Sequence, residues 1–160
     1  MTNNENEIIF EAKMLVDRIK LKYPDFIGKT ANESDIVVLE RKLKMKLPKW
    51  YIELYTTVPL IDAEFGVQED EPDEDYDGIS YMMWGSVNDI IVESTECEPG
   101  ISALKDGYVF VASCSHGSGD PIFIKLSSND NPGVFRLYHD DFTKVQLTNN
   151  LSSLFKNAII

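Results

Sequence analysis

Several residue types are scarce in this sequence, and each scarcity excludes a class of protein. The chain has only two cysteines in 160 residues, too few for a disulfide framework, which predicts a reduced, cytoplasmic setting. No apolar run reaches the length of about 18 residues that a membrane-spanning helix needs, and the N-terminal stretch MTNNENEIIF predicts no signal peptide. Two thiols and two histidines that lie far apart are also too few to predict a zinc site.

Basic residues are missing from a long middle segment. Of the 27 acidic residues, 14 lie in residues 50–104, which contain no lysine or arginine, whereas the other 105 residues hold 13 acids and all 15 bases. The net charge of −12 is therefore produced by one segment of this acidic protein. That segment would repel a phosphate backbone, so we do not expect nucleic acid as the ligand there.

The acids are densest in residues 62–77, DAEFGVQEDEPDEDYD, which hold nine acids and predict a solvated loop or protrusion. Such clustering costs self-repulsion, so a basic protein partner would explain it; a merely solubilising loop is the alternative. Tyr76 is either an aromatic anchor for that partner or a solvated side chain. The candidate partner-binding residues are Asp70, Glu71, Asp73, Glu74, Asp75, Tyr76 and Asp77.

Three apolar runs joined by turn-rich links organise the predicted fold: Tyr108–Ala112, Ile122–Leu126 and Val134–Tyr138. Strands on links this short pair antiparallel. Further strands are predicted over residues 79–84 and 144–147, and a polar connection over residues 93–106. Helical periodicity with start and stop signals predicts helices over residues 4–22, 36–47, 48–58 and 151–158.

These elements predict the α+β class: a mainly antiparallel sheet with helices packed on one face. The length and the apolar fraction of 43% suit a single domain over residues 1–160.

Two patterns resemble chemical sites without completing them. Asp73, Asp75 and Asp77, followed by Gly78, match the first half of a calcium loop, but the twelfth position is Trp84 instead of the bidentate glutamate. We therefore predict no tight metal site. Residue types of a hydrolase also gather near one link, but no G-x-S-x-G elbow surrounds them, and turn residues bonded to nearby backbone amides are the commoner interpretation. These residues are Ser113, Ser115, His116, Ser118, Asp120, His139 and Asp140.

Several motifs occur in the order and spacing of one known family. They are Ile36–Leu43, Leu47–Tyr51, Gly119-Asp120 before a strand, Val134–Asp140, and a closing helix at Leu151–Phe155. Together they resemble the SMI1/KNR4 family, also called the SUKH superfamily. The resemblance covers a core of about residues 33–157 and leaves the helix over residues 4–22 as an N-terminal addition. The resemblance implies an α+β fold and brings no catalytic residues. It also implies similarity to bacterial immunity proteins, which neutralise toxin domains that are often nucleases, and to fungal regulators of cell-wall synthesis and signalling.

From these observations we expect a non-enzymatic binding protein without a cofactor, whose basic protein partner is a toxin domain. The alternative is a regulatory protein-interaction module linked to cell-wall synthesis or signalling. An enzyme that uses Ser115 or His116 is the third hypothesis. No membrane and no nucleic acid is expected as a partner.

Overall fold

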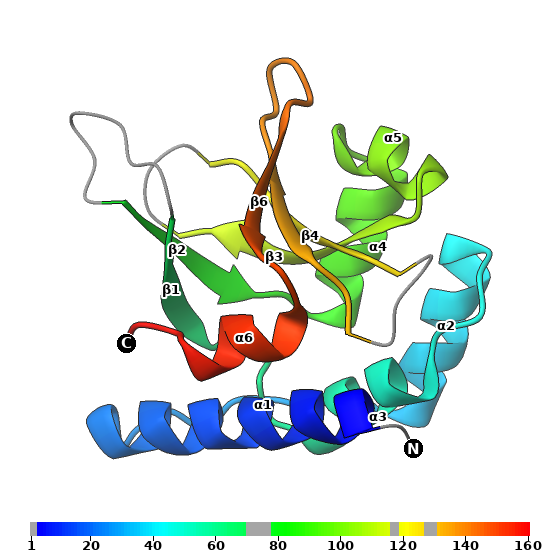
Figure 1. Ribbon diagram of the computed structural model, residues 1–160. Helices are drawn as coiled ribbons and strands as arrows, with labels where there is room; N and C mark the ends of the chain where they lie inside the picture. The colour runs from blue at the N-terminus through cyan, green and yellow to red at the C-terminus, as the bar shows by residue number, and fades with distance from the viewer. Residues whose placement is uncertain (1–2, 70–77, 116–118, 127–130) are drawn as a thin grey trace.

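The computed structural model describes residues 3–69, 78–115, 119–126 and 131–160 (Figure 1). Its centre is a six-stranded sheet in the order β1-β2-β3-β4-β5-β6, in which every pair of neighbours is antiparallel. The predicted meander of three central strands and the two further strands are confirmed. The strands are β1 Glu64–Gln68, β2 Ile79–Trp84, β3 Tyr108–Cys114, β4 Ile122–Lys125, β5 Val134–Leu137 and β6 Lys144–Thr148.

The helices begin at capping residues that the sequence displays. Asn32 and Asp35 form a reciprocal capping box at the start of α2, and the Asn150 side chain accepts a hydrogen bond from the Ser153 amide at the start of α6. α2 ends earlier than predicted, because Lys44 adopts a left-handed conformation with φ of 56°. The helices are α1 Asn3–Lys22, α2 Glu33–Leu43, α3 Lys49–Thr57, α4 Val87–Thr95, α5 Gly100–Lys105 and α6 Leu151–Lys156.

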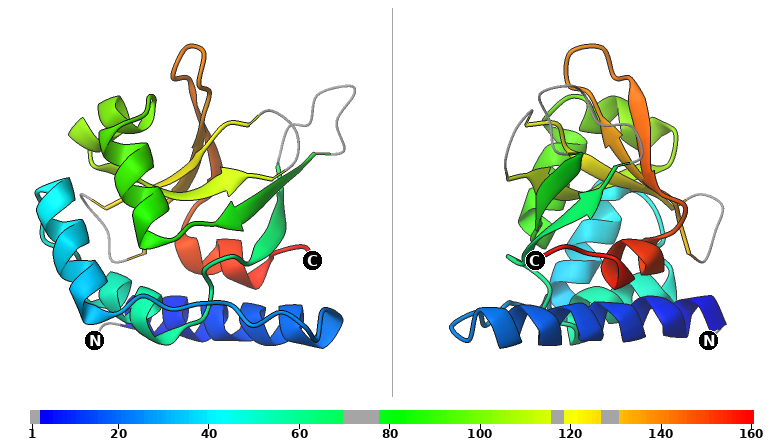
Figure 2. Two further views of the ribbon diagram at one scale, coloured as in Figure 1. Left: turned by 180° about the vertical axis from the view of Figure 1, so that it is seen from behind. Right: turned by 60° about the vertical axis from the view of Figure 1, so that its left-hand side comes forward.

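Helix α6 packs on the concave face of the sheet, and α1 and α3 lie side by side at the bottom of the view in Figure 1 (Figures 1 and 2). The Phe155 ring of α6 meets Trp84 of β2 edge-on at 5.4 Å between centroids, and the Tyr55 ring of α3 stacks on Trp84 at 6.2 Å. α1 is tied to the C-terminal residues through Arg18, whose guanidinium donates to the carbonyl oxygens of Phe155 and Ala158.

The opposite face of the sheet carries α4 and α5, which pack on β3. The α+β class and its antiparallel sheet are confirmed, and the structure differs from the expected arrangement in having helices on both faces. As a consequence Ile122, Phe123 and Ile124 are all buried, although their side chains alternate between the two faces. Alternation alone would place only one set in the core, either Phe123 or Ile122 together with Ile124.

Two predicted irregular regions contain regular elements. β1 lies inside residues 62–77, where the density of acids concealed the buried Phe65 and Val67. The predicted polar connection over residues 93–106 contains the end of α4 and all of α5. The sequence feature that indicates the start of α4 is the capping box formed by Ser86 and Asp89.

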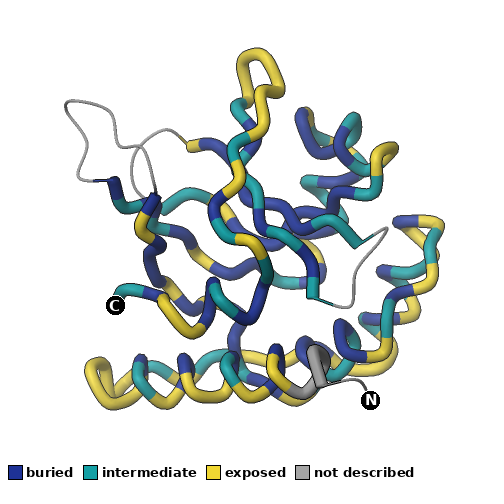
Figure 3. Tube along the Cα trace, viewed as in Figure 1, coloured by how far each residue is buried: buried dark blue, intermediate teal, exposed yellow. Residues whose placement is uncertain are grey.

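Burial follows the layers (Figure 3). The inner side of α1 contributes Ile8, Ala12, Leu15 and Ile19 to the core, whereas Phe10 on its other side is 58% exposed. Among the described residues, no helix is both long enough and apolar enough to cross a membrane.

Candidate protein-binding surface

The β1–β2 hairpin holds the two ends of the acidic segment, residues 70–77. In this hairpin Phe65 pairs with Met82 and Val67 with Ser80, so these side chains share the concave face. The other face carries the side chains of Glu64, Gln68, Tyr81 and Met83. Helices α4 and α5 do not bury any of these four residues. We call this face the outer face of the hairpin.

The residues that flank the acidic segment, Gln68 and Glu69 on one side and Gly78 on the other, are called its neck. They are joined by backbone and side-chain hydrogen bonds. The Glu69 amide donates to the Gly78 carbonyl oxygen at 2.6 Å, and the Gln68 side-chain amide donates to the same oxygen at 3.0 Å. Gly78 has φ of 81°, a conformation that costs glycine little and most other residues more. The two residues that flank the acidic segment, Glu69 and Gly78, are therefore held side by side.

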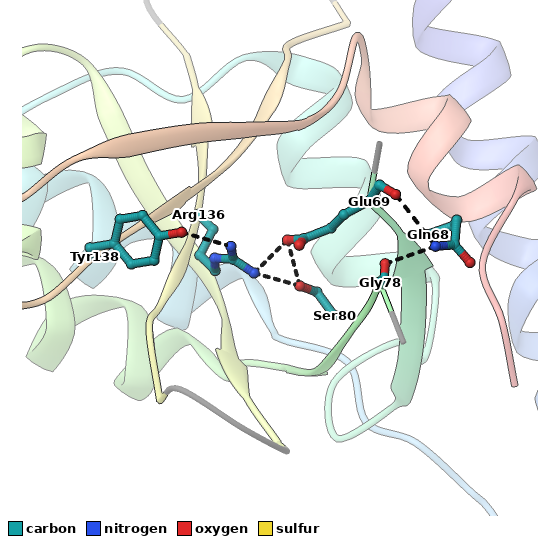
Figure 4. Close-up of polar contacts among 6 residues, drawn as sticks. All are labelled: Gln68, Glu69, Gly78, Ser80, Arg136 and Tyr138. Atoms are coloured by element: carbon teal, nitrogen blue, oxygen red, sulfur yellow. Dashed lines mark hydrogen bonds and ion pairs between the residues drawn. The ribbon is translucent and has the colours of Figure 1, made fainter. Parts of the chain in front are cut away.

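A buried ion pair fixes the same neck from inside the sheet (Figure 4). The Arg136 guanidinium of β5 donates to the Glu69 carboxylate and to the Ser80 hydroxyl, the latter at 2.8 Å, while the Ser80 hydroxyl donates to Glu69 at 2.7 Å. The guanidinium also donates to the Tyr138 hydroxyl at 3.3 Å. The side chains of Arg136 and Glu69 are only 12% and 8% exposed, so their charges are largely removed from water.

This ion pair joins strands that are not neighbours in the sheet. β5 is separated from β2 by β3 and β4, so Arg136 reaches Ser80 only because the sheet curls around its concave face. A buried pair of this kind contributes little net stability compared with an apolar pair, but the loss of one partner leaves a buried charge, which costs about 3–5 kcal/mol. The neck of the acidic segment is thus anchored to the far side of the sheet.

The predicted partner-binding residues themselves lie outside the described part of the chain, and the same holds for the calcium-loop aspartates. What the structure describes are their two neighbours, Glu69 and Gly78. Trp84, which occupies the twelfth position of the calcium pattern, is buried in a strand. Within the described residues, no group of three or more metal-ligating side chains comes together. The binding role of Asp70, Glu71, Asp73, Glu74, Asp75, Tyr76 and Asp77 stays a prediction.

The residues considered for a hydrolase are arranged differently from a catalytic triad. Asp120 is buried, and its carboxylate accepts from the His139 backbone amide at 3.0 Å and lies 2.5 Å from the His139 Nδ1 atom. The His139 Nε2 atom lies 3.2 Å from the Asp140 carboxylate. Both ring nitrogens therefore face carboxylates. Ser113 lies near the end of β3 and Ser115 directly after it, while His116 and Ser118 lie outside the described residues.

The Asp120–His139 contact also explains the electrostatics of this corner. The hydrogen bond that the Asp120 carboxylate accepts, followed by the negative charge of Asp140, raises the pKa of the exposed His139 imidazole above its usual value. The contact ties the link before β4 to the end of β5. The Gly119-Asp120 motif thus has a structural role in the described fold.

Sequence reasoning did not single out the outer face of the hairpin or the anchor inside it. Alternation in Glu64–Gln68 and Ile79–Trp84 would have separated the two faces, since side chains of a strand alternate with a period of two. Arg136 and Glu69 lie 67 residues apart, and no local pattern indicates their pairing.

Comparison with known proteins agrees with this fold. The model of the SMI1 / KNR4 family (SUKH-1) matches residues 30–157, which include the whole sheet, the neck residues and the Gly119-Asp120 motif. Helix α1 lies outside the matched range. A search of curated proteins gives no match.

Proposed function

Because the chain belongs to the SMI1/KNR4 family (SUKH-1), we propose that it is a non-catalytic binding protein that neutralises a cognate toxin domain by direct contact. Its partner surface would include the acidic segment, residues 70–77, and the partner would present a basic face. A nuclease toxin has such a face, because its substrate cleft binds phosphates.

The observation that carries the proposal is the partition of charge. Residues 50–104 contain 14 acids and no bases, and the hairpin at their centre holds the acidic segment by its neck. A concentrated field of one sign accelerates the encounter with an oppositely charged surface. The buried Arg136–Glu69 pair supports the same view, since an anchored neck limits the entropy that the segment loses on binding.

A non-catalytic role is supported by the chemistry of the described polar clusters. Arg136, Glu69 and Ser80 form hydrogen bonds with one another in the interior, and Asp120 holds His139 by two contacts. Neither cluster places a nucleophile beside a base in a cleft. Each serves instead to join strands or links of the sheet.

Growth rescue tests the proposal directly. Cells that express the toxin domain encoded beside this chain's gene should recover growth when the chain is co-expressed, and the two purified proteins should elute as one complex. Failure of both measurements would contradict toxin neutralisation. A stable complex with a non-toxic protein, without rescue, would instead favour the regulatory interaction module.

A further inference from the structure

Helix α1, which runs along one edge of the molecule (Figures 1 and 2), is apolar on two opposite sides. Its buried side packs on α6 and α3. The other side carries Phe10, Met14 and Leu21, which are 58%, 44% and 86% exposed. At 3.6 residues per turn, these three positions and Asp17 fall on one stripe about 60° wide. We call Phe10, Met14, Asp17 and Leu21 the α1 stripe. A surface helix normally has a single apolar side, so the α1 stripe indicates a second contact.

The charges of α1 indicate what that contact is. Residues 3–22 contain four acids and four bases, so α1 is neutral within a chain of net charge −12. A two-fold contact between identical chains places one patch against itself, so a patch with net charge repels its own copy. Residues 50–104, with 14 acids and no base, would do so. Helix α1 is therefore suited to meet a second copy of this acidic chain.

We propose that the α1 stripe binds the α1 stripe of a second copy, with the two helices antiparallel about a two-fold axis. Near the middle of the stripe, facing positions then have residue numbers that add up to about 30 or 31. Phe10 lies beside Leu21 of the second copy, and Lys13 beside its Asp17. Symmetry forms each contact twice.

The pairing of Lys13 with Asp17 makes the contact self-complementary. Both side chains are exposed, and no ion pair within the described part of the chain engages either of them. In the antiparallel pair each gains an opposite charge at the border of the apolar contact. A parallel pair would instead bring Asp17 against Asp17, and like charges that face each other oppose binding.

The dimer leaves the remaining surfaces available. Helix α1 lies outside residues 30–157, the range that the family model matches, so the contact uses neither the sheet nor the neck of the acidic segment. The stretch from Phe10 to Leu21 is about 17 Å long at 1.5 Å per residue. A contact of this size predicts a weak, reversible dimer rather than an obligate one.

Sedimentation equilibrium of the full chain tests the proposal over about a hundredfold range of concentration, because mass action favours the dimer at the upper end. We expect a monomer–dimer equilibrium. Phe10→Gln with Leu21→Gln should weaken it about tenfold or more, because both apolar contacts are lost twice. Glutamine keeps the helix propensity. The matched control is Val37→Gln, which changes a 61% exposed apolar residue of α2 outside the stripe and should leave the equilibrium unchanged.

A charge exchange tests the antiparallel arrangement itself. Asp17→Lys places a lysine opposite Lys13 of the second copy, and Lys13→Asp places two acids together. Each single variant should weaken the dimer about three- to tenfold, as expected for exposed charges. The double variant Lys13→Asp with Asp17→Lys should restore the original affinity. Circular dichroism checks that each variant keeps its fold.

Three outcomes would overturn the inference. A chain that stays monomeric over the whole range would leave the α1 stripe to a different protein. A dimer that is insensitive to the stripe variants would use another surface. A double variant as weak as the single ones would contradict the antiparallel pairing. Growth rescue does not bear on these outcomes, because the proposed toxin contact requires neither the stripe nor a dimer.

Discussion

Residues that alternate along the β1–β2 hairpin end in opposite environments. On the concave face, Trp84 is 1% exposed and packs against Tyr55 and Phe155. Its chain neighbour Met83 is 38% exposed and lines a groove of about 360 Å³ between β1, the end of α1 and the C-terminal residues. One peptide unit therefore separates a residue of the core from a residue of the candidate binding surface.

The difference shows that one hairpin separates a buried face from an exposed one by the alternation of its side chains. Burial of the concave face supplies the hydrophobic free energy, and Arg136 anchors Glu69 there. The outer face contributes little to the core, so substitutions there should change stability little. Three predictions test this division in order of decreasing effect, and a fourth, with the smallest effect, concerns a distant corner of the sheet.

The first prediction compares the two neighbours directly. Trp84→Ala should lower the free energy of unfolding by about 3–5 kcal/mol, because it leaves a cavity among three aromatic rings. Met83→Ala should change it by less than about 0.5 kcal/mol, as is usual for surface substitutions. Urea unfolding followed by circular dichroism measures both. Similar losses for the two variants would break the proposed division between the faces.

The second prediction compares an interior ion pair with an exterior one. Arg136→Met should cost about 3 kcal/mol, because it leaves the Glu69 carboxylate buried without its cation. Lys29→Met, which breaks the exposed pair with Asp62, should cost about 0–1 kcal/mol. The double variant Glu69→Gln with Arg136→Met should recover much of the loss in the same unfolding experiment. A double variant as unstable as Arg136→Met would show that the packing of Arg136, not the buried charge, matters.

The third prediction concerns the acidic segment, where substitutions should leave the free energy of unfolding unchanged. Replacing Glu71, Asp73, Glu74 and Asp75 with their amides should slow association with a basic partner, and the effect should shrink in high salt. Tyr76→Ala should instead raise the dissociation rate. If Tyr76 is an anchor, the loss of binding free energy should be about 1–2 kcal/mol. Surface-plasmon kinetics at two ionic strengths separate the two effects. Unchanged association at low salt would leave the segment as solubilising surface.

The fourth prediction concerns a corner of the sheet far from the hairpin. Asp120 raises the pKa of His139, so the charged imidazole stabilises the fold. This contribution is fully present below the unfolded pKa of about 6.5 and is lost as the pH rises through the higher folded value. NMR titration of the ring protons should give a raised pKa that returns toward its usual value in Asp120→Asn. His139→Gln assigns the signal against that of His116.

The sequence alone determined the elements whose patterns are local. Helix α1 was predicted within one residue of its observed start, because apolar residues recur at helical spacing up to Pro24. The three central strands were predicted because β-branched and aromatic runs alternate with turn signals. The concentration of acids in residues 50–104 is likewise a property of the sequence.

Only the tertiary structure decided how these elements meet. The pairing of Arg136 with Glu69 spans 67 residues and depends on the curl of the whole sheet. The groove needs α1, β1 and the C-terminal residues together, three parts of the chain that no local pattern relates. The physical reason is the same in both cases. Periodicity reports which side of a strand or helix is apolar, whereas the partner of that side is chosen by packing among distant segments.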